Sequence, residues 1–263
     1  MLVNLKTIHK PQSLEEAAEY LSPAGVYPIY GSGAWLVRAG LTAAEAIVDL
    51  SALVSPVCQA DVQGDVALSP AATLESICSG PLAEVDVAIY GGLSTLIKSE
   101  ISETLRNAMT LGDVFMECDS GSLVLTMLSG LQTDVHIFDG ESRNQLTMRM
   151  RDWFSLTDDQ RRQLIITDVR CREYGLSRYV FDKVARTPAD APIVAVVGFC
   201  HIEAPETSAF TIVGGLSGHP AHYVEGMQST IDDYKGSAEY RTAMARTLSE
   251  RVIDRVIALA KKQ

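Results

Sequence analysis

The sequence lacks the features that would tie the chain to a membrane or to nucleic acid. No apolar run approaches the ~18 residues that a spanning helix needs, and residues 1–9 lack the basic start and apolar stretch of a signal peptide. Lys and Arg number 22 against 33 Asp and Glu, which gives a net charge of −11. Because an excess of cations is needed to neutralise phosphate groups, this balance argues against nucleic acid and against an anionic membrane surface. We therefore expect a soluble, cytoplasmic protein.

Closely spaced cysteines are also missing. The five cysteines lie far apart, and no two of them stand in a C-x-x-C arrangement. Iron–sulfur clusters and structural zinc sites usually draw on closely spaced thiolates, so the sequence predicts neither of them in this chain. An odd number of cysteines without an export signal favours reduced and mostly buried thiols. These residues are Cys58, Cys78, Cys118, Cys171 and Cys200.

The first fifty or so residues predict a strand–helix–strand unit. Ser13 and Glu16 have the spacing of a capping box, and apolar residues follow them at helical spacing. The apolar runs at 25–30 and 46–50 are short enough to be strands. A crossover of this kind favours parallel strands, whose carboxyl ends commonly carry the loops that bind ligands.

The remainder of the chain predicts a mixture of helices and strands. Apolar residues recur at helical spacing over 93–107, and residues 122–131 are apolar almost all round, which indicates a buried helix. Beyond residue 163 we expect four strands, at 164–173, 178–184, 193–203 and 209–214, and then a long amphipathic helix at 237–262.

This order of elements predicts an α+β protein. With 47% of its 263 residues hydrophobic, the chain is able to bury several sizeable cores. We expect three consecutive parts: a small parallel-sheet subdomain at 1–54, a larger mixed α/β subdomain at 55–160, and a C-terminal antiparallel-sheet-plus-helices domain at 163–263.

Two loops carry the pattern of a phosphate cradle. The first loop, residues 30–34, contains Gly31 and Gly33, and the second loop, residues 110–114, contains Gly112. Glycine suits such loops because the missing Cβ lets backbone N–H groups close on a phosphate and permits positive φ. Either loop alone is more often an ordinary turn.

The whole chain resembles the flavin subunit of molybdenum hydroxylases, the group that includes carbon monoxide dehydrogenase and xanthine dehydrogenase. The order and spacing of several segments carry this resemblance, since no single segment is specific. Besides the two loops and Pro220, they are residues 11–17, 47–51, 105–107, 181–186, 189–191, 213–215 and 237–245.

The resemblance implies that the first two subdomains together bind FAD. It implies further that FAD accepts electrons from a partner [2Fe–2S] subunit and passes them to an acceptor, while a separate molybdenum-cofactor subunit oxidises the substrate. The residues that match the cofactor-binding positions are Gly31, Ser32, Gly33, Ala34, Arg106, Thr110, Leu111, Gly112, Asp113 and Lys183.

Both loops depart from the family pattern. The first reads roughly Ala-Gly-Gly-Thr-Asp in the family, and here Ser32 keeps a hydroxyl donor whereas Ala34 replaces a polar contact. The second reads roughly Thr-Ile-Gly-Gly-Asn, and here Asp113 adds a carboxylate while Val114 removes an amide. Two like charges about 4 Å apart near a surface repel by roughly 4 kcal/mol, so Asp113 opposes a diphosphate if it faces the ligand rather than solvent.

Three functions therefore stay open at the level of sequence. The chain is an FAD-binding electron-transfer subunit, or a flavin-free homologue that serves as a scaffold or assembly subunit, or a small-molecule binder that uses the vacated cleft. We interpret His219 and His222 as a surface pair rather than a metal site. The adjacent acidic pairs at 158–159 and 232–233 are typical of solvated turns or helix starts.

Overall fold

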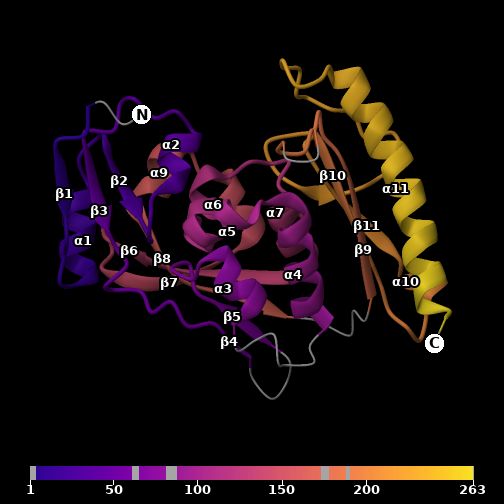
Figure 1. Cartoon of the computed structure of the whole chain (residues 1–263), viewed down its shortest axis with the longest axis horizontal. Helices are drawn as coiled ribbons and strands as arrows, with labels where there is room; N and C mark the ends of the chain where they lie inside the picture. Colours follow the sequence, from indigo (N-terminus) through magenta and orange to yellow (C-terminus); the bar gives the residue numbers. More distant parts are fainter. Residues whose placement is uncertain (1–3, 61–64, 81–87, 173–177, 188–189, 263) are drawn as a thin grey trace. The chain divides into compact units, whose positions relative to one another are not determined.

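The computed structural model describes residues 4–60, 65–80, 88–172, 178–187 and 190–262 (Figure 1). Ala189, one residue of the family-like segments, lies outside these ranges. The chain falls into two compact units. The first unit comprises Met1–Glu84, Glu103–Glu117 and Thr133–Cys171, and the second comprises Val85–Ser102, Cys118–Gln132 and Arg172–Gln263. The three consecutive parts expected from the sequence stay a prediction.

A three-stranded parallel sheet opens the first unit, as predicted. Its strands are β1 (Thr7–His9), β2 (Val26–Ile29) and β3 (Ala46–Asp49), in the order β1-β3-β2. Helix α1 (Leu14–Leu21) begins where expected, because the Ser13 hydroxyl accepts from the Glu16 N–H at 3.2 Å. The Glu16 carboxylate bonds the N–H of Gln12, one residue before the partner that a capping box requires. The short helix α2 (Ala34–Arg38) follows β2 directly.

A five-stranded sheet forms the larger part of the first unit. Its order is β4-β5-β8-β6-β7, and the strands are β4 (Gln59–Ala60), β5 (Val66–Leu68), β6 (Gln132–Asp139), β7 (Asn144–Arg149) and β8 (Leu164–Arg172). The sequence predicts β8 as the first strand of the C-terminal domain, but β8 pairs antiparallel with β5. The helices of this region are α3 (Leu74–Ser79), α5 (Glu103–Ala108), α6 (Leu111–Glu117), α8 (Met150–Ser155) and α9 (Asp158–Gln163).

The helix expected over 93–107 is two helices. α4 (Ala88–Glu100) ends with the Ile101 N–H on the Ile97 carbonyl, and α5 starts at Glu103. Ser102 stands between them, and serine favours helix starts because its hydroxyl competes with the backbone for hydrogen bonds. Apolar spacing alone gave no sign of this break.

The second unit is an antiparallel sheet with a helix on each face. The strands run β12 (Ala221–His222), β11 (Phe210–Gly214), β10 (Val194–Cys200) and β9 (Arg178–Val184) across the sheet. Figure 1 shows α7 (Leu123–Gly130) and the long α11 (Ala238–Ala260) on opposite sides of it. Neighbouring β10 residues face these helices in turn, since Gly198 lies against Val252 of α11 and Phe199 against Gly130 of α7. The buried helix and the long terminal helix are confirmed.

The α+β class is therefore confirmed, since the described residues form one parallel and two antiparallel sheets. Among the described residues, no helix combines the length and hydropathy needed to cross a bilayer. Cys78, Cys171 and Cys200 are buried, and Cys58 and Cys118 are partly buried.

Candidate functional site

The second loop is the start of helix α6. Thr110 and Asp113 bond each other reciprocally: the Thr110 N–H donates to Asp113 Oδ2 at 2.8 Å, and the Asp113 N–H donates to Thr110 Oγ1 at 3.2 Å. The Thr110 hydroxyl also donates to Asp113 Oδ2 at 3.1 Å. This is capping-box geometry with Asp113 three residues after the cap, so the segment is a closed helix start.

The remaining N–H groups of this loop also have acceptors within the first unit. The Leu111 N–H donates to the Ala72 carbonyl at 3.0 Å, and the Gly112 N–H to the Pro70 carbonyl at 2.8 Å. A phosphate at a helix start is held by backbone N–H groups that point at it. Every backbone N–H from 110 to 113 is already bonded to a protein oxygen, so this loop offers none to a diphosphate.

The ring of Tyr30 packs into the bend of the second loop. A Cβ added at Gly112 would lie 2.3 Å from Tyr30 Cδ2, so only glycine admits the ring there. The Tyr30 hydroxyl accepts from the Ile166 N–H at 2.7 Å, and the side chain is 1% exposed. Burial raises the pKa of this phenol, which keeps it neutral. Tyr30 stands where the loop pattern of the resembled family has alanine.

The first loop requires glycine at two positions. Gly33 has φ +67°, a conformation that favours glycine, and a Cβ at Gly31 would lie 2.7 Å from Thr110 Cγ2. The Ser32 hydroxyl donates to the Ala108 carbonyl at 2.6 Å, which joins this loop to the residues just before the second. Within the described part of the chain, the N–H groups of residues 31–33 have no protein acceptor.

Asp113 lies inward at the start of α6. Its side chain is 0% exposed, and Oδ1 makes no hydrogen bond. Burial raises the pKa of this carboxyl, while the Thr110 donors, the backbone N–H of Trp35 and the Arg38 guanidinium act in the opposite direction. The sequence left two orientations open, toward the ligand or toward solvent. The structure shows a third, in which the carboxylate is used inside the protein.

The two cationic residues predicted for the cofactor have partners elsewhere. Arg106, on α5, pairs with Glu75 of α3 at 2.6 Å, and both side chains are largely buried. Lys183 lies on β9 of the second unit, where its Nζ donates to the Ser99 carbonyl at 3.1 Å. The structure thus brings residues 31–34 together with 110–113 in the first unit. Arg106 forms its ion pair in the same unit, whereas Lys183 lies in the second unit.

We tested this arrangement against FAD, the cofactor that the resemblance implies. The first loop has the free N–H groups and the glycine conformation that a diphosphate needs. The second loop has neither free N–H groups nor open space, because Asp113 and the Tyr30 ring fill it. The second loop does not fit the cofactor.

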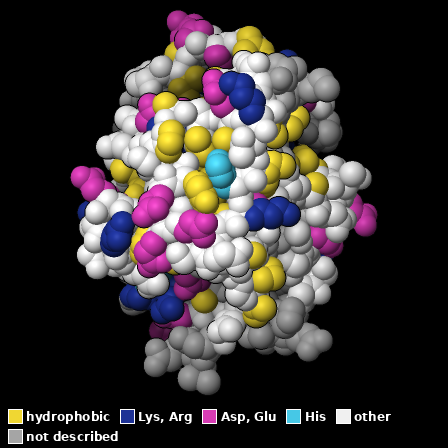
Figure 2. Space-filling model, turned by 90° about the vertical axis from the view of Figure 1, so that its left-hand side faces the viewer, with side chains coloured by type: hydrophobic (Ala, Val, Ile, Leu, Met, Phe, Trp, Pro, Cys, Tyr) yellow, Lys and Arg dark blue, Asp and Glu magenta, His cyan; other side chains and the backbone are white. Residues whose placement is uncertain are grey.

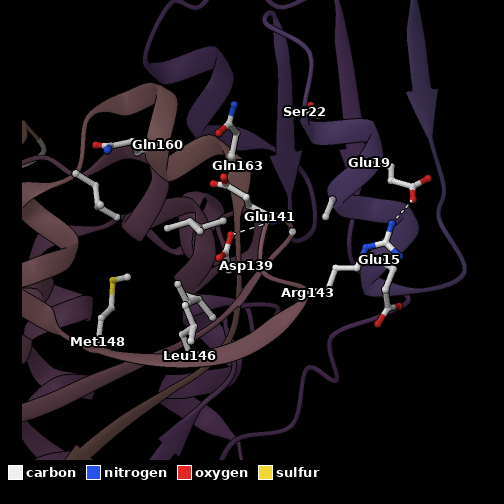
Figure 3. Close-up of a pocket in the computed structure, with 15 residues that line it drawn as sticks. Glu15, Glu19, Ser22, Asp139, Glu141, Arg143, Leu146, Met148, Gln160 and Gln163 are labelled. Atoms are coloured by element: carbon white, nitrogen blue, oxygen red, sulfur yellow. Dashed lines mark hydrogen bonds and ion pairs between the residues drawn. The ribbon is translucent and has the colours of Figure 1, made fainter.

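A larger groove lies elsewhere in the first unit (Figure 3). Its volume is about 570 Å³, and it lies between α1, the β6–β7 hairpin and α9. Ile137 and Leu146, paired across the hairpin, line it, while Glu19 of α1 meets Arg143 of the hairpin turn at 3.3 Å. None of the predicted site residues lines this groove. The sequence gave no signal for it because its lining comes from separate segments.

The remaining sequence candidates behave as ordinary structural residues. Asp158 and Asp159 lie in the first turn of α9 and pair with Arg161 and Arg162. No cluster of three or more metal-ligating side chains occurs within the described ranges. On the face drawn in Figure 2, basic side chains are scattered among acidic and hydrophobic ones.

No protein-family model matches the chain, and a search of curated proteins finds no match either. Solved structures do match over nearly the full length. A chain of quinoline 2-oxidoreductase from Pseudomonas putida 86 superposes with a TM-score of 0.82 at 17% identity, covering 99% of both chains.

Carbon monoxide dehydrogenases give similar values. A chain of the reconstituted enzyme from Oligotropha carboxidovorans superposes with a TM-score of 0.79 at 19% identity, covering 98% of this chain and 99% of that one. The enzyme from Hydrogenophaga pseudoflava that lacks the Mo-pyranopterin moiety gives 0.76 at 15% identity, with the same coverage. At these identities the comparison establishes a shared fold.

Proposed function

We propose that this chain takes the place of the flavin subunit in a molybdenum hydroxylase-type oxidoreductase complex and acts there as a structural subunit without FAD. The full-length likeness to chains of quinoline 2-oxidoreductase and carbon monoxide dehydrogenase supports the place in the complex. The closed second loop is the observation that carries the structural role. Its N–H groups are bonded within the protein, those of Leu111 and Gly112 to the Ala72 and Pro70 carbonyls, and the Tyr30 ring fills its bend.

In this role the chain's own residues replace contacts that a cofactor would make. The capping box at Thr110 and the Ser32–Ala108 bond hold the two loops together. The Tyr30 ring excludes water from the bend, and its hydroxyl accepts from β8. The partners that this role requires are a molybdenum-cofactor subunit and a [2Fe–2S] subunit, which supply the redox centres that this chain's cysteines do not offer.

The test is purification of the tagged chain from its native host under gentle conditions. We expect molybdenum and iron to co-purify with it in fixed ratios by elemental analysis, and no flavin to be released from this chain on denaturation. Purification as a single polypeptide without either metal would contradict the place in a complex.

Electron transfer through FAD is the second candidate. The specific observation in its favour is the first loop, whose Gly33 conformation and free N–H groups suit a diphosphate. One FAD per chain in the purified complex would establish this function and would remove the structural one.

A further inference from the structure

Strand β7 forms one outer edge of the five-stranded sheet. It pairs with β6 along its whole length, from Asn144 opposite Asp139 to Arg149 opposite Asp134. The side chains of residues 144–147 are exposed. Within the described ranges, no hydrogen bond joins the other side of β7 to any segment, so alternate N–H and C=O groups point outward there without a partner. This is the arrangement that accepts a further strand.

The other sheet edges of the described chain are protected in ways that β7 is not. Folded proteins guard such edges with short strands, proline or charged side chains, because an open edge pairs with other chains. β1, β4 and β12 have three residues or fewer, β2 contains Pro28, and β9 carries Asp182 and Lys183. β7 has six residues with Arg149 as its only charge, and its Leu146 is 45% exposed. An edge of this length and composition indicates that a partner covers it.

The groove of about 570 Å³ beside β7 determines the chemistry of that partner. Figure 3 shows Leu146 and Met148 toward one end of the groove and Glu15 and Glu19 toward the other. The hairpin turn belongs to the acidic end, since a Cβ at Gly140 would lie 2.4 Å from Ala18 of α1. The charged residues of the lining are Glu15, Glu19, Asp139, Glu141 and Arg143. Arg143 is paired with Glu19, so the lining keeps an excess of negative charge.

We propose that β7 receives an extended segment of a partner polypeptide, which adds a strand to the sheet and places apolar and basic side chains in this groove. Main-chain hydrogen bonds to β7 give affinity, and alternate side chains give specificity. The apolar ones lie beside Leu146 and Met148, and a Lys or Arg meets the carboxylates near the hairpin turn. A second copy of this chain fits less well, because pairing through β7 would bring two acidic grooves and two chains of charge −11 together.

This surface is separate from the two glycine loops, so the inference goes beyond the proposed function and holds with or without FAD. The test uses the full chain and a labelled peptide with blocked ends, Lys-Thr-Val-Thr-Val-Thr-Lys. Its lysines and valines share one strand face, and its pattern is the same in both directions, so either strand orientation brings a lysine to the acidic end. A peptide with glutamate in place of both lysines is the charge control. Fluorescence anisotropy measures binding, and amide hydrogen exchange is followed with and without peptide.

We expect the lysine peptide to bind roughly tenfold more tightly than the glutamate peptide. It should slow hydrogen exchange in β7 but not in β9. Leu146→Lys and Glu141→Lys should each weaken binding by roughly fivefold or more, through lost apolar contact and reversed charge. Val57→Lys and Glu103→Lys are the matched controls, because both positions are exposed and lie outside the groove. Both should bind the peptide like the unmodified chain.

Absence of binding, equal affinity for the two peptides, or binding that leaves the exchange of β7 unchanged would overturn the inference. A dimer of the unmodified chain in sedimentation that Leu146→Lys dissociates would also overturn it, because the edge would then belong to a second copy. The flavin content of the purified complex is scored separately. Bound FAD would reject the structural role proposed above and leave the peptide results standing.

Discussion

At the scale of single residues, two carboxylates accept hydrogen bonds at helix starts, Asp113 at α6 and Glu100 at α7. The sequence identifies Asp113 as a departure from the family pattern, and the resemblance implies that the two glycine loops bind one diphosphate. The direction in which the Asp113 side chain points was not predictable from the sequence. It depends on the Tyr30 ring and on Trp35, which come from a distant segment of the chain. The sequence analysis did not identify Glu100, because the residues next to it in the sequence do not indicate that it accepts a hydrogen bond from the start of another helix.

Glu100 makes the stability of the chain depend on pH. Its Oε2 accepts from the Val124 N–H at the start of α7 at 3.2 Å. Burial raises its pKa from 4.5 to about 7, against the Val124 and Leu123 N–H groups and Lys183. Because the folded-state pKa is raised, this carboxyl stabilises the fold at pH below its unfolded pKa, and that contribution is lost as pH rises through about 7.

We therefore expect the free energy of unfolding to fall between roughly pH 5 and pH 8, by about 1–3 kcal/mol from this group. Glu100→Gln should flatten this part of the profile in denaturant titrations at a series of pH values. Glu103→Gln, at an exposed position, should leave the slope as it is. An unchanged slope in Glu100→Gln would show that other groups cause the dependence.

At the scale of elements, local patterns located most helices and strands but not their partners. The strand at 164–172 was found by its apolar pattern, yet its pairing with β5 depends on contacts across a hundred residues, such as Val66 with Cys171. Helix α6 was read as a loop although Thr110 and Asp113 have the spacing of a helix start. The glycine pattern of the resemblance outweighed that signal.

The packing of α11 on β10 gives a test at this scale. A Cβ at Gly198 would lie 2.5 Å from Val252 Cγ1, so Gly198→Ala should lower the free energy of unfolding by about 1–3 kcal/mol through overpacking. Val252→Ala removes the opposing methyl groups, and the double variant should recover part of the loss. Gly218→Ala is the control, because open space surrounds that position. Equal effects at Gly198 and Gly218 in urea unfolding would contradict this packing.

At the scale of the whole molecule, the chain passes repeatedly between its two compact units. The second unit draws on Val85–Ser102 and Cys118–Gln132 as well as the C-terminal residues. Dividing the sequence into consecutive domains did not predict this interleaving, because the apolar pattern of a helix does not indicate which sheet the helix packs against.

This interleaving makes a prediction about fragments. A fragment of residues 163–263 contains α11 but lacks α7, so one face of its sheet loses the helix that covers it, including the Phe199 contact with Gly130. Exposing such a face leaves a large apolar surface in water, which disfavours a stable fold. We expect the fragment to aggregate or to bind a hydrophobic dye without native near-UV circular dichroism. A fragment that begins at residue 85 retains both helices, so the second unit in it should show native-like packing of α11, although its first-unit segments lack β4 and β5. If the shorter fragment folds cooperatively by itself, the C-terminal domain predicted from the sequence is autonomous, and α7 is dispensable for it.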